Sequence, residues 1–205
     1  VVINLDLKNF FPSIAYHRVK GLFHKAGYSE SLATVLGLLC CEPDIESVEL
    51  DGERWFVQQG ERHLPQGAPT SPAISNLLCR SLDRRLQGLA AKYGFTYTRY
   101  ADDLTFSAHK DGQAYVNKLM WAIRNIVKDE GFTLHPDKTR IMHRGHQQEV
   151  TGLVVNDQLS IDRKTLRRFR ALIHQIEQSG PEGKSWNGHQ QAKPLLRSVL
   201  GFANF

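Results

Sequence analysis

The sequence of 205 residues contains no long hydrophobic run, few cysteines and only two methionines. No apolar stretch approaches the roughly 18–20 residues that a membrane-spanning helix needs, so we expect no membrane segment. The first ten residues carry neither the basic flank nor the small-residue cleavage site of a signal peptide. The sequence therefore predicts a cytoplasmic protein.

Cysteine occurs only at Cys40, Cys41 and Cys79. An odd number with two adjacent members makes neither a disulfide framework nor the paired spacing of a zinc site. Free cysteine behaves as a small hydrophobic residue, so we expect all three in the core. The histidines show no zinc-ligand spacing either, and His143 and His146 lie in a polar loop.

Charge and apolar content are both moderate. Hydrophobic residues make up 41% and charged residues 23%, which excludes collagen-like and disordered chains. The length suits one domain with a small second lobe. Lys plus Arg exceed Asp plus Glu by 26 − 21 = 5. This basic excess is compatible with a polyanionic partner but does not establish one.

Hydrophobic periodicity and turn signals predict an alternation of strands and helices. The expected elements are a buried strand at 1–5, helices from Pro12 to about Gly27 and from Ser29 to about Cys41, a hairpin at 48–57 around Asp51-Gly52, a helix from Ser71-Pro72 to Gly94, a hairpin at 95–107, a helix from about Gln113 to Asp129, and short strands at 139–142 and 150–155. Strands with helices on one face predict an α+β sheet domain.

Two helices carry clear apolar stripes. The expected buried positions are Leu32, Val35, Leu36 and Leu39 in the first, and Ile74, Leu78, Leu82 and Leu89 in the second. The chain turns at Asn156-Asp157, and a basic helix begins at Asp162, so we place a domain boundary at 157–162. The abrupt opening on a buried strand predicts that the sequence is part of a longer protein.

Three acids stand beside apolar strands. Asp6 ends the first strand, and Asp102 and Asp103 are adjacent at the tip of a hairpin. Carboxylates in such places need a compensating charge, and a divalent cation supplies one. Carboxylates that converge on two Mg²⁺ ions about 3.5–4 Å apart form the two-metal arrangement for phosphoryl transfer. Taken alone, an Asp-Asp pair is more often a solvated turn than a metal site.

Three motifs occur together and in order: Asp6 to Phe11, Leu64 to Pro72, and Tyr100 to Asp103. This ordered set resembles the catalytic core of reverse transcriptases. The resemblance implies a right-hand polymerase palm at 1–157, with an antiparallel sheet and helices on one face. It implies a helical partial thumb at 158–205, and the fingers, normally upstream of the first aspartate, are missing from this sequence.

Details of the motifs resemble bacterial retron reverse transcriptases in particular. The strings that carry this resemblance are Gln66 to Asn76, Arg99 to Ser107, and Val150 to Leu153. Group II intron reverse transcriptases share much of the first two strings and remain the alternative. An RNA-dependent RNA polymerase has a similar palm, but an aromatic ring at Phe11 argues against it.

The resemblance assigns roles around the acids. Asp6, Asp102 and Asp103 match the carboxylates that bind the metal ions in this family, and the backbone carbonyl of Leu7 matches a further metal ligand. Lys138 matches a lysine proposed as the general acid for pyrophosphate departure, a role that suits a protonated amine near a leaving phosphate. A plain surface lysine is the alternative.

Further residues match the positions that contact nucleotide and primer. Phe11 falls where a bulky ring lies under the sugar and selects deoxynucleotides, although it could be a core aromatic. Gln66 and Gly67 match the loop beside the incoming nucleotide, and a simple Pro/Gly turn is the alternative. Tyr100 would lie beside the primer end, unless it only packs.

The last helix carries two stripes. Arg163, Arg167, Arg170 and His174 fall at i, i+4, i+7 and i+11, and Leu166, Phe169, Ile173 and Ile176 form an apolar stripe. Thumb helices grip the template–primer backbone, and a row of arginines suits phosphates. A solvated basic face is the alternative.

The resemblance thus implies an RNA-directed DNA polymerase of retron type with two Mg²⁺ ions, for which Mn²⁺ could substitute. Its partners would be an RNA template, a DNA or RNA primer, deoxynucleoside triphosphates, a cognate non-coding RNA and an effector protein in antiphage defence. A rival of another class is a non-catalytic RNA-binding scaffold derived from a polymerase. Such scaffolds tend to lose acids, whereas Asp6, Asp102 and Asp103 are all present.

Overall fold

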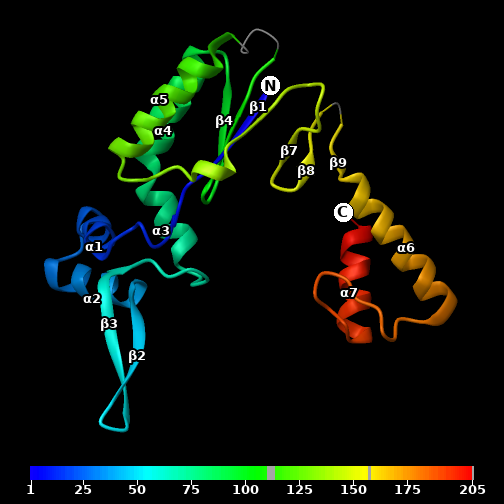
Figure 1. The fold of residues 1–205 in the computed structure, drawn as a ribbon. Coiled ribbons are helices and arrows are strands. Elements are labelled where there is room, and N and C mark those ends of the chain that lie inside the picture. The colour runs from blue at the N-terminus through cyan, green and yellow to red at the C-terminus, as the bar shows by residue number, and fades with distance from the viewer. Residues whose placement is uncertain (110–113, 157, 205) are drawn as a thin grey trace. The chain divides into compact units, whose positions relative to one another are not determined.

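The computed structural model describes residues 1–109, 114–156 and 158–204 (Figure 1). The chain divides into two compact units, Val1–Thr151 and Gly152–Phe205. The division falls a few residues before the boundary expected from the sequence. Gln113, the expected start of a helix, and Asp157, the expected turn residue, lie outside the described residues.

A four-stranded antiparallel sheet organises the first unit, in the order β4-β5-β1-β6. Its strands are β1 (Val2–Asp6), β4 (Thr96–Tyr100), β5 (Asp103–Ser107) and β6 (Arg140–Met142). The register pairs Ile3 with Phe106 and Leu5 with Leu104. The predicted first strand and the predicted hairpin at 95–107 are both confirmed.

The two faces of this sheet differ in chemistry. On one face Ile3, Leu5, Leu104 and Phe106 are fully buried, and the helices α4 (Arg80–Lys92) and α5 (Val116–Asp129) lie over it (Figure 1). Because strand side chains alternate, the residues between them occupy the other face. These are polar: Asn4, Asp6, Asp103 and Thr105. The prediction of an antiparallel sheet with helices on one face is confirmed.

The helix predicted from Ser71 to Gly94 is two helices, α3 (Ser71–Leu78) and α4, which separate at Cys79. Ser71 was expected as the N-cap, but Thr70 occupies that position. The Ser71 hydroxyl instead donates to the Pro65 carbonyl, at 2.7 Å, and holds the preceding loop against the helix. Of the expected core positions on this segment, Ile74 and Leu82 are buried and Leu78 and Leu89 are half-buried.

The helices α1 (Tyr16–Lys25) and α2 (Glu30–Cys40) form a pair. Ser29 caps α2 as expected, by accepting the Leu32 amide. The predicted apolar stripe is wrong, because α2 turns its small residues toward α1. A Cβ added at Gly37 would lie 2.9 Å from the Tyr16 ring. The larger side chains consequently face outward, and Leu39 is 78% exposed.

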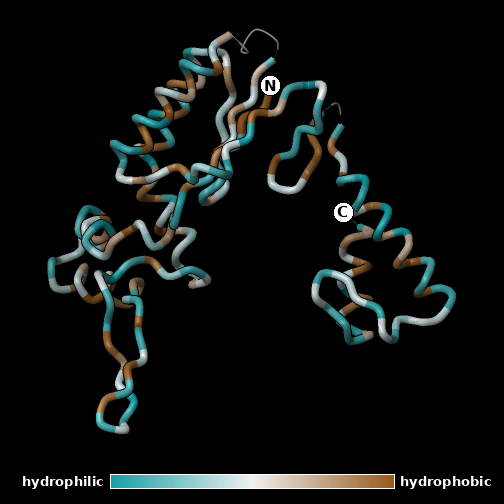
Figure 2. The backbone as a smooth tube through the Cα atoms, viewed as in Figure 1, coloured by the Kyte–Doolittle hydropathy of each residue, from teal (hydrophilic) through white to brown (hydrophobic). Residues whose placement is uncertain are grey.

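The hairpin expected around Asp51-Gly52 is present and longer than expected. It consists of β2 (Glu42–Leu50) and β3 (Glu53–His63). Asp51 and Gly52 both have positive φ, at 54° and 78°, as a tight two-residue turn requires. Apolar residues lie among polar and charged ones along it (Figure 2), and Trp55 and Phe56 are 54% and 72% exposed.

The three cysteines belong to the first unit, and the strand expected at 150–155 spans the division between the units. Cys41 and Cys79 are buried as expected, and Cys40 is half-buried. The strand expected at 150–155 is two short strands, β7 (Glu149–Val150) and β8 (Leu153–Val154). They separate at Thr151 and Gly152, whose φ angles are 48° and 86°.

The second unit contains β9 (Ser160–Ile161), paired antiparallel with β8, and the helices α6 (Arg163–Ser179) and α7 (Ala192–Ala203). Asp162 caps α6 by accepting the amides of Lys164 and Thr165, so the basic helix begins where it was predicted. The hydrophobic core of the second unit consists of Phe169, Leu172, Trp186 and Leu195. Within the described ranges, no helix is long and apolar enough to cross a bilayer.

The contrast between buried and exposed leucines gives a stability prediction. Leu104 in β5 is completely buried, so Leu104→Ala should lower the free energy of unfolding by about 3 kcal/mol through lost burial and a residual cavity. Leu39→Ala is the matched control and should change it by less than about 0.5 kcal/mol. Urea unfolding of both variants measures the difference. Equal losses would contradict the assignment of the core.

Candidate active site

Two of the predicted acids are neighbours across the sheet. Asp6 at the end of β1 pairs in register with Asp103 at the start of β5. Directly opposed residues of an antiparallel pair project from the same face, with Cβ atoms about 4.5–5.5 Å apart. Both carboxyl groups therefore project from the polar face of the sheet.

Asp102 is brought to the same corner by a tight turn. The two-residue turn Ala101-Asp102 joins β4 to β5, and Ala101 adopts the left-handed conformation with φ at 50°. The Leu7 amide donates to the Asp102 carbonyl over 3.0 Å, which ties the turn to the end of β1. The bent tip expected from the sequence is therefore present.

Lys138 approaches the acids from another segment. It ends the short 3₁₀ helix η2 (Pro136–Lys138), and its Nζ donates to Asp6 Oδ2 over 2.9 Å. The Asp6 side chain is only 12% exposed, against 56% for Lys138. The His135 amide donates to the Asp6 carbonyl over 2.7 Å, so the backbone of this segment is fastened to β1 as well.

The charges at this corner act on one another. The hydrogen bond from Lys138 to Asp6 raises the pKa of the lysine, and the negative charges of Asp6, Asp102 and Asp103 raise it further. Partial burial raises the pKa of the Asp103 carboxyl, with the neighbouring charges of Asp102 and Asp6 adding to the effect. The three acids and the lysine form one electrostatic cluster.

A hollow of about 350 Å³ opens beside this cluster. Among its lining residues are six that the sequence predicted: Asp6, Leu7, Phe11, Gln66, Asp102 and Lys138. Gln66 comes from the loop before α3, and Phe11 from the segment after β1, where its ring packs at 5.2 Å from that of Phe10. Residues from four separate segments thus meet at one place.

Other predicted residues lie beside the hollow or elsewhere. Gly67 follows Gln66 with φ at 97°, a conformation that favours glycine. Tyr100 pairs with Asp103 and is 73% exposed. Arg163, Arg167 and Arg170 are exposed on α6 in the second unit, while Phe169 of the other stripe is buried.

Sequence reasoning missed several residues of the hollow, namely Asn9, Phe10, Pro12 and His135. The first three lie inside the first motif, so proximity to Asp6 was the available signal. His135 directly precedes the segment that carries Lys138, but no pattern in its surroundings points to the acids.

The oxygen donors at this corner suit a hard divalent cation chemically, since carboxylates are the ligands that Mg²⁺ prefers. They do not form a preorganised metal site: among the described residues, no group of three His, Cys, Asp or Glu side chains has the spacing that would hold a metal ion. Here the ammonium of Lys138 compensates the charge of Asp6. The residues present fit a cation that gathers the carboxylates around it.

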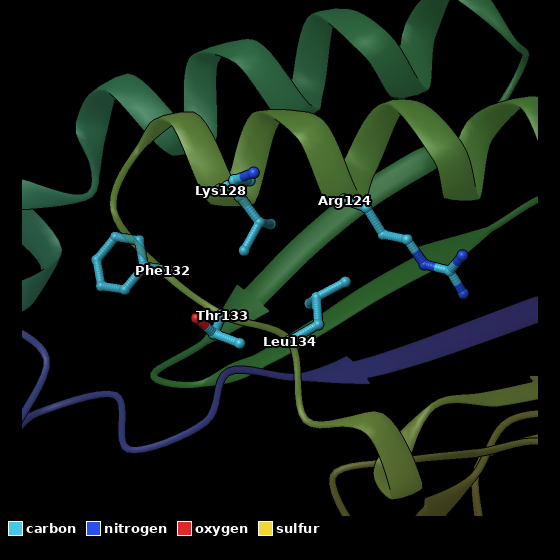
Figure 3. Close-up of a pocket in the computed structure, with 6 residues that line it drawn as sticks. Arg124, Lys128, Phe132, Thr133 and Leu134 are labelled. Atoms are coloured by element: carbon cyan, nitrogen blue, oxygen red, sulfur yellow. The ribbon is translucent and has the colours of Figure 1, made fainter.

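A second hollow, of about 300 Å³, lies between α5 and the segment that follows it. Figure 3 shows Arg124 and Lys128 on the helix and Phe132, Thr133 and Leu134 on the segment. It is lined by two cations and apolar groups and has no carboxylate. We therefore take the acid-lined hollow as the candidate active site.

Comparison with known proteins identifies the family of the chain. The family described as "Reverse transcriptase (RNA-dependent DNA polymerase)" matches residues 1–179. The chain belongs to the reverse transcriptase family. Retron Mx162 reverse transcriptase of Myxococcus xanthus is 46% identical over 213 residues, which cover 97% of this chain and 44% of that protein. Retron Ec86 reverse transcriptase of Escherichia coli is 38% identical, over 85% of this chain and 49% of that protein.

The chain thus spans less than half the length of these relatives. Among solved structures, a foamy viral protease-reverse transcriptase in complex with an RNA/DNA hybrid aligns with a TM-score of 0.56 at 15% identity, over 100% of this chain and 21% of that one. Apo telomerase from Candida tropicalis aligns with a TM-score of 0.53 at 15% identity, over 78% of this chain and 35% of that one. These likenesses confirm the palm-like α+β fold.

The raised pKa of Asp103 predicts how this residue affects stability in metal-free buffer. A carboxyl whose pKa is raised on folding destabilises the fold at neutral pH, and this effect disappears as the pH falls through the folded pKa toward the usual 3.8. We expect Asp103→Asn, in EDTA, to raise the free energy of unfolding at neutral pH and to leave it unchanged in acid below that value. Urea unfolding across this range measures it, and a loss of stability at neutral pH would contradict the charge cluster.

Proposed function

We propose that this chain is the palm and the start of the thumb of a retron-type RNA-directed DNA polymerase, with the palm at 1–157 and the thumb at 158–205. The observation that carries the proposal is the hollow in which Asp6, Asp102 and Lys138 meet Phe11 and Gln66. Acids that can hold divalent ions and a cation beside them suit the transfer of a nucleotide to a primer hydroxyl, and an aromatic wall suits the selection of its sugar.

Asp6, Asp102, Asp103 and the Leu7 carbonyl would hold Mg²⁺, or Mn²⁺ in its place. The bound ions would lower the pKa of the primer hydroxyl and neutralise charge on the triphosphate. The position of Asp6 opposite Asp103 supports this assignment, because two strands then supply donors from one face.

Lys138 would supply the proton for the departing pyrophosphate. Its neighbours favour the ammonium form, which is the form that can donate. Once a cation compensates Asp6, the ammonium is free to turn toward the phosphates. Its 56% exposure leaves it room to do so.

Phe11 and Gln66 would contact the incoming nucleotide. The Phe11 ring would exclude a 2′-hydroxyl, and the Gln66 amide would bond to sugar or phosphate beside Gly67. Tyr100 would lie beside the primer end, because it shares a face with Asp103. The exposed arginines of α6, Arg163, Arg167 and Arg170, would bind phosphates of the template–primer duplex.

The retron assignment draws on the relatives, three of which are at least 38% identical to this chain and are retron reverse transcriptases. It extends to a cognate structured RNA as template, an effector protein and a role in antiphage defence. A group II intron enzyme is less favoured, because the string Val150 to Leu153 resembles retron enzymes.

The experiment is a primer-extension assay with the protein as it occurs naturally. Purified enzyme, an RNA template with an annealed primer, and deoxynucleotides should give an extended product and one pyrophosphate per addition. EDTA should stop the reaction and added Mg²⁺ should restore it. No extension on RNA templates, with intact folding shown by circular dichroism, would overturn the proposal.

A further inference from the structure

Arg99 lies behind the acidic turn, on the face of the sheet covered by α4. Its side chain is only 6% exposed. It pairs with Asp83 of α4 through two parallel bonds, Nε to Oδ1 and Nη2 to Oδ2, each of 2.7 Å. The Tyr97 hydroxyl also donates to Asp83 Oδ1, at 2.8 Å. Asp83 therefore fixes the plane of the guanidinium.

The remaining nitrogen of Arg99 reaches the turn itself. Nη1 donates to the Ala101 carbonyl and to the Asn76 side chain, at 3.1 Å in both cases. Ala101 is the residue with φ at 50°, a conformation that is unfavourable for any residue with a Cβ and persists only where the surroundings hold it. The carbonyl held by Arg99 belongs to the peptide that leads into Asp102.

We propose that Arg99, held in place by Asp83, is a positioning residue that fixes the backbone of the turn carrying Asp102 and Asp103. This inference rests on the proposed function, since it assigns those acids to the reaction. Arg99 touches no reacting group; it links α4 to the turn across the sheet. A buried ion pair alone is weak evidence for stability. The pair of Arg99 with Asp83 differs because Arg99 also donates to the Ala101 carbonyl of the strained turn, and this bond gives the pair a role in placing the acids.

Lysine cannot replace arginine in this role. Its ammonium is a point charge without the planar fork, so it can pair with Asp83 or reach the Ala101 carbonyl but cannot hold both in one geometry. Arg99→Lys therefore keeps the charge and releases the turn. Misplacement of a catalytic group by about 1 Å reduces the rate by up to roughly a hundredfold.

Two variants serve as matched controls. Tyr97→Phe removes a partner of the same Asp83 oxygen without touching the turn. Arg85→Lys changes an arginine of α4 that pairs with Asp129 and Glu130 at 2.8 and 2.9 Å and has no bond to the turn.

The test measures kcat of primer extension and the Mg²⁺ concentration that gives half-maximal rate. Arg99→Lys should lower kcat by about 10- to 100-fold and raise the Mg²⁺ requirement several-fold. The two controls should change either quantity by less than about twofold. Arg99→Lys that folds and keeps wild-type kcat and Mg²⁺ dependence would overturn the inference.

An unfolded variant would not decide the question, so a second variant replaces the whole buried polar group. Asp83→Leu, Tyr97→Phe and Arg99→Met together leave no buried charge unpaired and should fold. This triple variant should show the same loss of kcat, and wild-type kcat would overturn the inference.

Amide hydrogen exchange separates this inference from the proposed function. The Leu7 amide is bonded to the Asp102 carbonyl, so release of the turn in Arg99→Lys should speed its exchange by about tenfold, whereas Arg85→Lys should not. If the wild-type enzyme extends no primer, the proposed function fails, and the exchange rate still decides whether Arg99 holds the turn.

Discussion

We expect primer extension to fall at least about a thousandfold when Asp102 is replaced by asparagine, which corresponds to roughly 4 kcal/mol of lost transition-state stabilisation. Asparagine keeps the size of the side chain and the backbone of the turn, but it removes the negative charge that would hold a cation. We expect Asp6→Asn to have the same effect, because Asp6 lines the same hollow. Single-turnover extension of a labelled primer measures the loss.

Asp129→Asn is the control for this prediction. Asp129 is an exposed acid at the end of α5 and pairs with Arg85 away from the hollow. Its replacement should leave the extension rate within about twofold of wild type. If the double variant Asp102→Asn, Asp103→Asn still extended primers, these two acids would not carry the reaction and the two-metal assignment would be refuted.

Phe11→Ala should admit ribonucleotides. The ring lines the hollow together with Gln66, and its removal opens space where a 2′-hydroxyl would lie. We expect the preference for deoxynucleotides over ribonucleotides, measured as the ratio of kcat/KM values, to fall by about 10- to 100-fold, since a steric clash of this kind is worth a few kcal/mol.

Phe11→Leu and Phe11→Tyr test whether bulk is the cause. Leucine should give an intermediate ratio, and tyrosine should retain the wild-type ratio because it keeps the ring. An unchanged ratio in Phe11→Ala, in a variant that still extends primers with deoxynucleotides, would refute the steric role and leave Phe11 as a packing residue beside Phe10.

The strands and the places of the three acids on them could be predicted because their signals are local, whereas the roles of the residues around them came from the resemblance. Asp6 ends an apolar strand, and Asp102 and Asp103 occupy a hairpin tip, so period-two alternation already places Asp6 and Asp103 at strand ends. Ser29 and Asp162 start their helices as side-chain caps, which depend only on the following turn. Lys138 was found by resemblance alone, and its ion pair with Asp6 spans 132 residues of sequence.

The sequence predictions fail where the structure of a segment depends on which distant segment packs against it. The large apolar residues of α2 predict a core stripe, yet close approach of α1 favours Ala33 and Gly37 at the contact. The break between α3 and α4 at Cys79 could not be predicted, because neither proline nor glycine lies next to it in the sequence. Arg99 escaped notice because its role requires Asp83, which lies on a helix that a sequence alone cannot orient toward the turn.

The β2–β3 hairpin has a consequence for handling the protein. Within the described residues, these two strands form a sheet of their own, and His63 at the end of β3 bridges to Ala15. The outer backbone edges toward the tip of the hairpin and the rings of Trp55 and Phe56 are open to further chains. Glu42, Asp44, Glu46 and Glu49 along β2 carry like charges that repel other copies of the ribbon. Replacing these acids by glutamine or asparagine would remove the repulsion along this strand and should promote association between copies of the ribbon.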